Sequence, residues 1–266
     1  MKGDEHMGRS NVTKSELERR KDKIKPSRVT KEDLIKKAKD IDSNVPKKVA
    51  RSRPYKNKAH KHDIIYDIIS TGSKGNCVII NDTMVDIGVS YKVVKDKLDL
   101  ISTLLITHIH SDHVRASTLS TIKKKHPHIT IIGNYEVHQH FGVDIVSNHD
   151  YPVKVGRRVY HPFKGEHSVE VQGFIWEMHG KDIIYATDTS TLEHSPDDKK
   201  YDYLFIEANY DEKKTNEMMK QKTGNYNPYL SAMRHLSKQK CKLFYYTHRK
   251  EKDSKLIELH QSGRFY

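Results

Sequence analysis

The sequence is poor in cysteine and has no long apolar segment. Only two of its 266 residues are cysteine, Cys77 and Cys241, which excludes the disulfide framework that stabilises many small secreted proteins. No apolar run approaches the roughly 18 residues needed to cross a bilayer, and the N-terminus lacks the apolar core of a signal peptide. We therefore expect a cytoplasmic protein that does not associate with membranes and whose two thiols are buried and reduced.

Acidic residues are also in the minority. The chain has 48 Lys and Arg against 35 Asp and Glu, a net charge of +13, and residues 1–60 alone hold 19 basic and 9 acidic side chains. Thr13 and Thr30 are each followed three residues later by a carboxylate, the spacing of a helix capping box. We expect a basic N-terminal arm of short helices and linker over residues 1–60 and one globular domain over residues 61–266. The arm is either a solvated, partly disordered tail or an extension that contacts the phosphates of nucleic acid.

Beyond the arm, short runs rich in β-branched and aromatic residues predict strands. These runs are residues 64–70, 77–87, 102–107, 129–133, 169–178, 181–188, 201–208 and 242–248. Helical stretches are expected over residues 111–126 and within 212–240. A turn at His179-Gly180-Lys181 joins two of the strands and indicates antiparallel pairing. Helices combined with mixed sheets imply a layered α/β architecture.

One stretch, LLITHIHSDHVRA, concentrates potential metal ligands directly after a buried strand. His108 and His110 are two residues apart, so extended backbone directs both side chains to one side. Asp112 and His113 follow at an expected helix start, where the turn brings them back to the same point. Imidazole and carboxylate are the donors that a borderline divalent ion prefers. The other His-x-His pairs lack the acidic partner and the preceding strand, and are expected to be surface or packing histidines: His60/His62, His126/His128 and His138/His140.

The pattern His-x-His-x-Asp-His after an apolar strand resembles the signature of the metallo-β-lactamase-fold superfamily. The resemblance implies a four-layer αββα fold and further ligands at strand ends, for which the sequence offers His167, Asp188 and His248. It also implies two divalent metal ions, with zinc expected and manganese or iron as alternatives. His108, His110 and His167 would hold one ion, and Asp112, His113 and His248 the other. Asp188 would bridge the two.

Three further segments narrow the resemblance to one branch. STGSKGNC (70–77), IEANYDEK (206–213) and MRHLSKQ (233–239) resemble segments of the YycJ/WalJ-like exonucleases, within the tRNase Z-like phosphodiesterases. Tyr210 and the Arg249-Lys250 pair depart from that branch's pattern. The interval from residue 189 to 247 leaves no room for the extra domain of the β-CASP nucleases.

The same segments supply candidate residues for substrate. The resemblance places Ser73, Asn76, Asn209 and Tyr210 near the substrate, and gives Asp112 and His235 catalytic roles. His235 is either a general acid that protonates the leaving oxygen or a histidine on a helix surface. Gly72 and Gly75 are either part of a phosphate-binding loop or simply a turn. Asp86 is expected to fix the ligand loop through hydrogen bonds and not to bind metal.

These observations predict a hydrolase: a metal-dependent phosphodiesterase that cleaves nucleic acid through a metal-bound hydroxide. A DNA exonuclease is favoured, with DNA preferred over RNA as the partner. Two alternatives remain, a cyclic-nucleotide phosphodiesterase of the same fold and a protein that binds nucleic acid or a larger assembly and has a structural metal site. By analogy with the superfamily, a homodimer is also expected.

Overall fold

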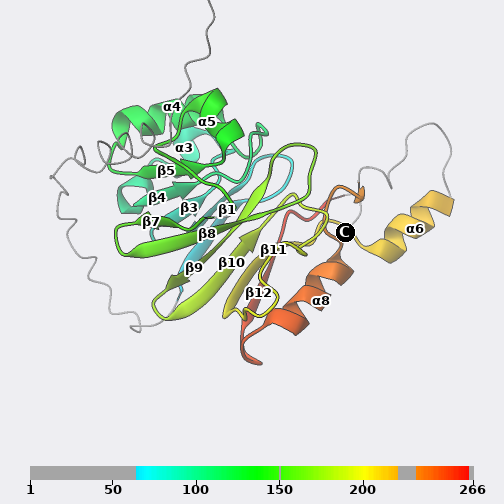
Figure 1. The fold of residues 1–266 in the computed structure, drawn as a ribbon. Helices are drawn as coiled ribbons and strands as arrows, with labels where there is room; N and C mark the ends of the chain where they lie inside the picture. The colour runs from blue at the N-terminus through cyan, green and yellow to red at the C-terminus, as the bar shows by residue number, and fades with distance from the viewer. Residues whose placement is uncertain (1–63, 150, 221–231, 264–266) are drawn as a thin grey trace, which may run out of the picture. The chain divides into compact units, whose positions relative to one another are not determined.

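The computed structural model describes residues 64–149, 151–220 and 232–263. The expected arm over residues 1–60 lies outside this part of the chain. The described residues all belong to one structural unit, Lys58–Tyr266, which contains two six-stranded sheets with helices on their outer faces (Figure 1). This is the four-layer αββα arrangement that the sequence predicted.

The first sheet is built from the N-terminal half of this unit. Its strands, in spatial order, are β1 (Tyr66–Ser70), β2 (Cys77–Ile80), β3 (Thr83–Val85), β4 (Thr103–Leu105), β5 (Thr130–Gly133) and β6 (Ile145–Val146). The strands from β1 to β3 pair antiparallel, whereas those from β3 to β6 pair parallel. Parallel pairing requires a connection that crosses the sheet. Here the crossovers carry three α-helices and a 3-10 turn: α3 (Tyr91–Val94), η1 (Leu98–Leu100), α4 (Ala116–Lys125) and α5 (Tyr135–Phe141).

The second sheet comes from the C-terminal half. Its spatial order is β12 (Lys255–Leu259), β11 (Tyr203–Glu207), β10 (Lys181–Ala186), β9 (Gln172–Met178), β8 (Arg158–Lys164) and β7 (Val153–Val155). The expected hairpin is present: β9 and β10 pair antiparallel across a turn in which His179 and Gly180 both have positive φ. In contrast, β10, β11 and β12 pair parallel. Helices α6 (Glu212–Lys220) and α8 (Lys238–His248) lie in the connection from β11 to β12.

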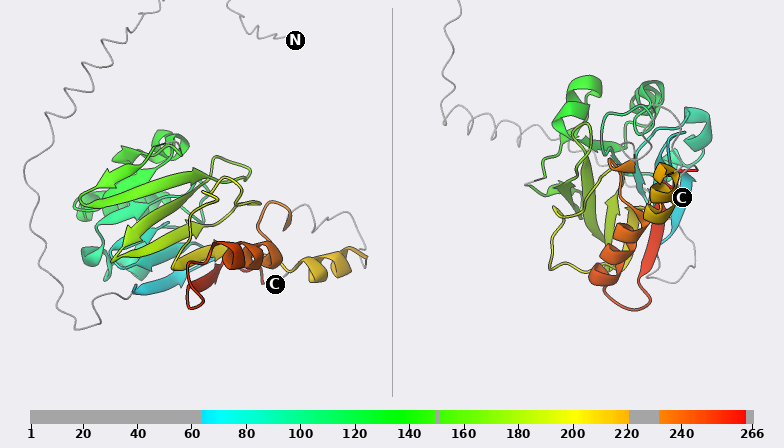
Figure 2. Two further views of the ribbon diagram at one scale, coloured as in Figure 1. Left: turned by 60° about the horizontal axis from the view of Figure 1, so that its bottom comes forward. Right: turned by 90° about the vertical axis from the view of Figure 1, so that its right-hand side faces the viewer.

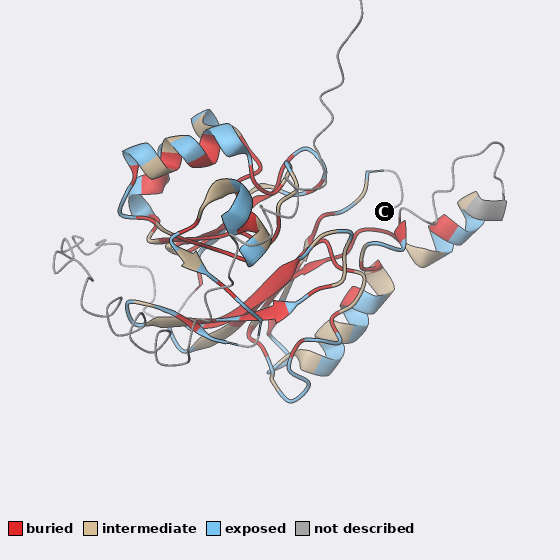
Figure 3. Ribbon diagram, turned by 45° about the horizontal axis from the view of Figure 1, so that its top comes forward, coloured by how far each residue is buried: buried red, intermediate tan, exposed pale blue. Residues whose placement is uncertain are grey.

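The layers are held together by three groups of buried apolar residues. Alternation along a strand sends successive side chains to opposite faces. In β11, Phe205 packs between the sheets, while Leu204 and Ile206 pack beneath α8. In β4, Leu104 faces the helices of the first sheet and Leu105 faces the second sheet. Figure 3 shows the strands as the most buried part of the molecule. Both cysteines are buried as predicted.

One predicted strand is a helix. Residues 242–248 belong to α8, whose N-terminus is capped by Ser237 through a hydrogen bond from the backbone N–H of Lys240 to its Oγ. The aromatic residues of this segment suggested a strand, but the parallel pairing of β11 and β12 requires a crossover. α8 supplies that crossover and packs Phe244 and Tyr245 onto the second sheet (Figure 2). Among the described residues, no helix combines the length and the apolarity needed to span a membrane.

Candidate metal centre

Several imidazole and carboxylate side chains meet at one end of the two sheets. Four of them lie at or just after the end of a strand: His108 beyond β4, Asp188 beyond β10, Glu207 as the last residue of β11 and His260 immediately after β12. Three overlapping groups of donor atoms have all members within 4.8 Å of one another, and all three groups include Asp188. Residues far apart in the chain therefore form a single cluster around one carboxylate.

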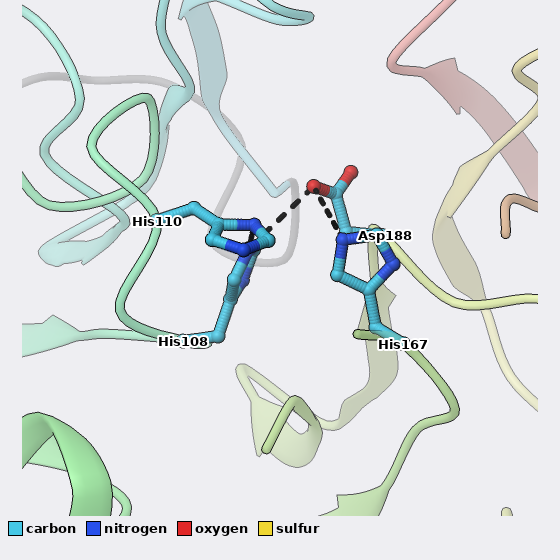
Figure 4. Close-up of side chains that lie close together, drawn as sticks. All are labelled: His108, His110, His167 and Asp188. Carbon is cyan, nitrogen blue, oxygen red and sulfur yellow. Dashed lines mark hydrogen bonds and ion pairs between the residues drawn. The ribbon is translucent and has the colours of Figure 1, made fainter. Parts of the chain in front are cut away.

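The first group contains His108, His110, His167 and Asp188. Nε2 of His108 is 3.0 Å from Nδ1 of His110 and 3.5 Å from Oδ2 of Asp188. Nε2 of His167 lies 3.9 Å from the same oxygen. Figure 4 shows the three imidazoles gathered beside the Asp188 carboxylate. Three imidazole nitrogens converging beside one carboxylate oxygen provide the donor set of a four-coordinate divalent ion.

The second group contains Asp112, His113, Asp188 and His260. Nε2 of His113 is 3.1 Å from Oδ2 of Asp188 and 3.8 Å from Oδ2 of Asp112. On the other side of Asp188, Nδ1 of His260 is 3.2 Å from Oδ1. Oδ2 of Asp188 is therefore near donors of both groups, His108 and His167 of the first and His113 of the second, so this carboxylate lies between the two groups.

The structure places His248 outside the cluster, which corrects the predicted final ligand. His248 is the last residue of α8, and its ring stacks on Phe244 at a centroid distance of 4.0 Å. The prediction treated residues 242–248 as a strand with a histidine at its end. The strand is instead β12, and His260 is the histidine that follows it.

Buried groups behind the cluster hold the ligand loop in place. Asp86, which has no exposed surface, accepts hydrogen bonds from the backbone N–H of Thr107 at 2.8 Å and from its hydroxyl. Its Oδ2 lies 2.7 Å from Nδ1 of His113. This carboxylate therefore orients His113 from behind and, as the sequence indicated, takes part in none of the donor groups.

Glu207 forms a second buried anchor. It has no exposed surface, and its Oε1 lies 2.7 Å from Nδ1 of His235 and 3.0 Å from Nδ1 of His260. Its Oε2 accepts hydrogen bonds from the backbone N–H of Thr189 at 3.0 Å and of Leu236 at 3.3 Å. With Asp188, His235 and His260 it makes up the third donor group. Glu207 therefore connects the bridging carboxylate's loop to the candidate acid His235.

Three residues of the centre adopt a backbone conformation that L-residues rarely use. Asp86, Asp188 and His260 have φ values of 61°, 50° and 53°, and each follows the end of a strand. Such left-handed conformations cost free energy and persist where surrounding contacts fix them, most often at functional sites. At these strand ends, Asp188 and His260 face the cluster and Asp86 contacts His113 from behind it.

Comparisons with known proteins identify the fold. Neither a family model nor a curated protein sequence matches the chain. Solved structures do match its fold. The protein YhfI from Bacillus subtilis, described as a metallo-β-lactamase fold protein, aligns with a TM-score of 0.55 at 14% identity, covering 74% of this chain and 85% of that one. Human tRNase Z, short form, aligns with a TM-score of 0.52 at 17% identity, over 75% of this chain and 93% of that one.

A third solved structure, a diphosphatase from the PhnP family, aligns with a TM-score of 0.50 at 13% identity, covering 75% of this chain and 87% of that one. The chain has the metallo-β-lactamase fold. At these identities the likeness establishes the architecture, and the local geometry of the cluster must carry any argument about chemistry.

Within this metallo-β-lactamase fold, the charge states of the side chains suit divalent cations. Burial lowers the pKa of His108 well below its usual value, so its imidazole is neutral and available as a donor. Burial would raise the pKa of Asp188, but His113 and the other nearby imidazoles outweigh it and hold that pKa well below normal. The buried Nε2 of His260 has no hydrogen-bond partner among the described residues. A neutral imidazole at His108, an ionised carboxylate at Asp188 and an unsatisfied buried nitrogen at His260 fit a site for metal ions.

Of the residues predicted to contact substrate, one is exposed and two are buried behind the cluster. Ser73 is exposed on the loop between β1 and β2 and stays a prediction as a substrate contact. Asn76 is buried, and its Nδ2 lies 2.8 Å from Nε2 of His113. Asn209 is buried too and donates to the carbonyl of His260 at 2.8 Å. Both asparagines therefore position donors of the cluster and are not free to meet a substrate.

The prediction that Tyr210 contacts substrate is also corrected. This residue is only 4% exposed and packs with Ala232 and Met218, so its ring belongs to a small core and does not face substrate. Glu207 and His260 also belong to the centre, although neither was among the predicted site residues. The sequence pattern could have indicated both, because each is a polar residue at the end of an apolar run: Glu207 ends YLFIE and His260 ends KLIELH.

Proposed function

We propose that this protein is a metal-dependent phosphodiesterase that hydrolyses nucleic acid, with DNA exonuclease activity favoured. The observation that carries the proposal is the placement of Asp188 between two sets of metal-type donors, with the Glu207–His235 pair beside it. Hydrolysis of a phosphodiester needs an activated water, charge neutralisation at the phosphoryl oxygens and a proton for the leaving oxygen. The cluster offers residues for each requirement.

The donor set accounts for the first two requirements. His108, His110 and His167 would hold one divalent ion, Asp112, His113 and His260 the other, and Asp188 would bridge them. Two such ions supply a hydroxide near neutral pH and neutralise charge on the phosphoryl group. Asp86 keeps His113 oriented, because its Oδ2 lies 2.7 Å from Nδ1 and Nε2 then faces Asp188 at 3.1 Å.

His235 meets the third requirement. Its Nδ1 is held by Glu207 at 2.7 Å, and its side chain keeps 18% of its surface exposed. Burial lowers the pKa of His235, but the hydrogen bond to Glu207 and the charge of that carboxylate outweigh burial and raise the pKa above its usual value. A protonated imidazole with Nδ1 fixed presents Nε2–H to a leaving oxygen. The alternative in which His235 is an ordinary surface histidine does not explain its buried carboxylate partner.

Two further observations support a phosphate substrate and a nucleic acid in particular. Among the structures with this fold are one named as a tRNase and one named as a diphosphatase. The chain carries a net charge of +13, and clustered Lys and Arg give salt-dependent affinity for polyanions. A cyclic nucleotide or another small substrate does not require this excess of positive charge.

The test is hydrolysis of linear DNA, RNA and cyclic nucleotides by the wild-type protein and by Asp188→Ala, with zinc or manganese added. We expect release of nucleotides from DNA that falls as salt rises and that is lost in Asp188→Ala. Turnover of cyclic nucleotides alone would replace the nuclease with a small-molecule phosphodiesterase. Full activity of Asp188→Ala on DNA would overturn the metal-dependent proposal.

A further inference from the structure

A pocket lies between helix α8 and the segment that follows Asp188, and its lining extends from Leu236, next to the candidate acid His235, along α8 to His248. Its volume is about 320 Å³, at the lower end of the range of pockets that hold small molecules. The described residues that line it are Thr191, Leu192, Glu193, Asp197, Leu236, Lys240, Leu243, Phe244 and His248. None of these residues belongs to the donor groups of the centre.

The pocket is tied to the centre through Glu207. Leu236 directly follows His235, and its backbone N–H donates to Oε2 of Glu207 at 3.3 Å. On the opposite wall, the Thr189 backbone N–H donates to the same oxygen at 3.0 Å, and the Thr189 hydroxyl donates to the carbonyl of Thr191 at 2.7 Å. Glu207 therefore fixes one residue on each side of the pocket, Leu236 and Thr189, and the same carboxylate contacts His235.

The chemistry of the walls suits an uncharged aromatic group. Leu192 and Leu236 are buried apolar residues, and the half-buried ring of Phe244 lies between α8 and the second sheet. The polar lining includes two carboxylates, Glu193 and Asp197, one ammonium group, Lys240, and the His248 imidazole that stacks on Phe244. Paired carboxylates repel phosphate, but they accept hydrogen bonds from the exocyclic amino groups of nucleobases.

We propose that this pocket binds the base of the leaving nucleoside; the inference rests on the proposed phosphodiesterase function. Hydroxide from water adds to phosphorus, the bond from phosphorus to the leaving oxygen breaks, and that oxygen takes the proton of His235 Nε2. The products are a phosphate monoester and a nucleoside with a free hydroxyl. Because the leaving oxygen must meet His235, the leaving group lies on the side of His235, whose neighbour Leu236 lines the pocket. Asp197 and Glu193 favour adenine and cytosine, which carry amino groups, over uracil and thymine.

The first experiment uses the methyl phosphodiester of adenosine, which can lose either adenosine or methanol. The wild-type protein with zinc is expected to release mainly adenosine, since methanol cannot fill the pocket. Leu243→Trp places a bulky ring at the pocket from an exposed helix position. It should shift the ratio of adenosine to methanol by about tenfold towards methanol. A general folding defect lowers both products together and leaves their ratio unchanged.

Matched controls come from neighbouring exposed positions. Tyr246 lies on α8 at 62% exposure and does not line the pocket, so Tyr246→Trp should keep the wild-type ratio. Asp197→Asn should reduce the preference for adenosine over uridine esters, whereas Asp198→Asn should not. An unchanged product ratio in Leu243→Trp, or equal shifts in Leu243→Trp and Tyr246→Trp, would overturn the pocket assignment.

A binding measurement separates this inference from the proposed function. Free adenosine is titrated into the zinc-loaded protein and followed by calorimetry, with Leu243→Trp expected to weaken binding about tenfold and Tyr246→Trp to leave it unchanged. If no phosphodiester is hydrolysed but adenosine binds in this pattern, the proposed function fails and the pocket stands. If phosphodiesters are hydrolysed but adenosine binding is absent or insensitive to Leu243→Trp, the pocket assignment fails and the enzyme stands.

Discussion

Glu207 Oε1 lies 2.7 Å from His235 Nδ1, and the carboxylate that makes this contact has no exposed surface. Burial would raise the pKa of Glu207, but hydrogen bonds with His235 and His260 outweigh it and lower the pKa. An ionised, buried carboxylate of this kind fixes the orientation of the imidazole and favours its protonated form. The Glu207–His235 pair therefore gives the centre a candidate proton donor.

Replacing Glu207 with Gln should alter the pH dependence of hydrolysis. Glu207 raises the pKa of His235, so removing its charge lowers that pKa and moves the alkaline limb of the kcat profile to lower pH. We expect kcat at neutral pH to fall by about tenfold, because a smaller fraction of His235 is protonated while the acid itself remains in place. The measurement is a kcat–pH profile with zinc content determined in parallel. An alkaline limb that stays in place in Glu207→Gln would show that His235 is not the acid.

Replacing His260 and replacing His248 should have opposite consequences. His260 lies 3.2 Å from the bridging Asp188, whereas His248 stacks on Phe244 at the end of α8. We expect His260→Ala to lose one of two bound zinc ions and nearly all hydrolysis, and His248→Ala to keep both ions. Metal content by plasma emission spectroscopy decides the matter. Loss of zinc from His248→Ala with retention in His260→Ala would contradict the assignment.

Binding of zinc should release protons. Burial lowers the pKa of His113, but Asp86 and Asp188 outweigh it and raise the pKa to about 10 in the metal-free protein. At pH 7 this imidazole therefore carries a proton that must leave before a metal can bind. Calorimetric titration with zinc in two buffers of different ionisation enthalpy should show net proton release and an affinity that falls as pH is lowered. Equal heats in both buffers would be inconsistent with a protonated His113.

The glycine of the segment MVDIGVS should be essential to the ligand loop. A Cβ at Gly88 would overlap the carbonyl of Asp112 and lie 2.9 Å from the backbone nitrogen of Asn76. We expect Gly88→Ala to destabilise the protein by about 1–3 kcal/mol, as for other overpacked sites, and to weaken zinc binding through Asp112. Gly263→Ala is the matched control, because its Cβ would have no neighbour within 4 Å. Thermal unfolding of both variants measures the difference, and equal melting temperatures would refute the close approach.

Acid should weaken the fold through a second cluster, away from the metal centre. Burial raises the pKa of Asp182, but hydrogen bonds from Lys250 and Lys199 outweigh it and lower the pKa. A carboxylate whose folded pKa is depressed stabilises the fold above its unfolded pKa and loses that stabilisation as pH falls through the folded value. Asp182→Asn should therefore cost about 1 kcal/mol at pH 7, and this cost should shrink as pH falls from the ordinary aspartate pKa through the lower folded pKa. Urea unfolding at several pH values tests this, and a cost independent of pH would exclude the ion pairs as its cause.

The parts of the centre that are close in sequence were predictable from the sequence. His108, His110, Asp112 and His113 fall within six residues after a buried strand, and local backbone geometry is enough to bring them together. His167 and Asp188 lie at the ends of runs with clear strand character, and the resemblance to the metallo-β-lactamase fold placed them in order. The four-layer architecture followed from the same resemblance.

The tertiary structure decided what depends on which strands are neighbours. Because β11 and β12 pair in parallel, the aromatic run 242–248 becomes the crossover helix, so His248 leaves the centre and His260 enters it. The same pairing places Glu207 and His260 side by side at one sheet edge and buries Tyr210 in the connection. Strand order depends on packing between segments that are distant in the sequence, so a local pattern of residues does not predict it.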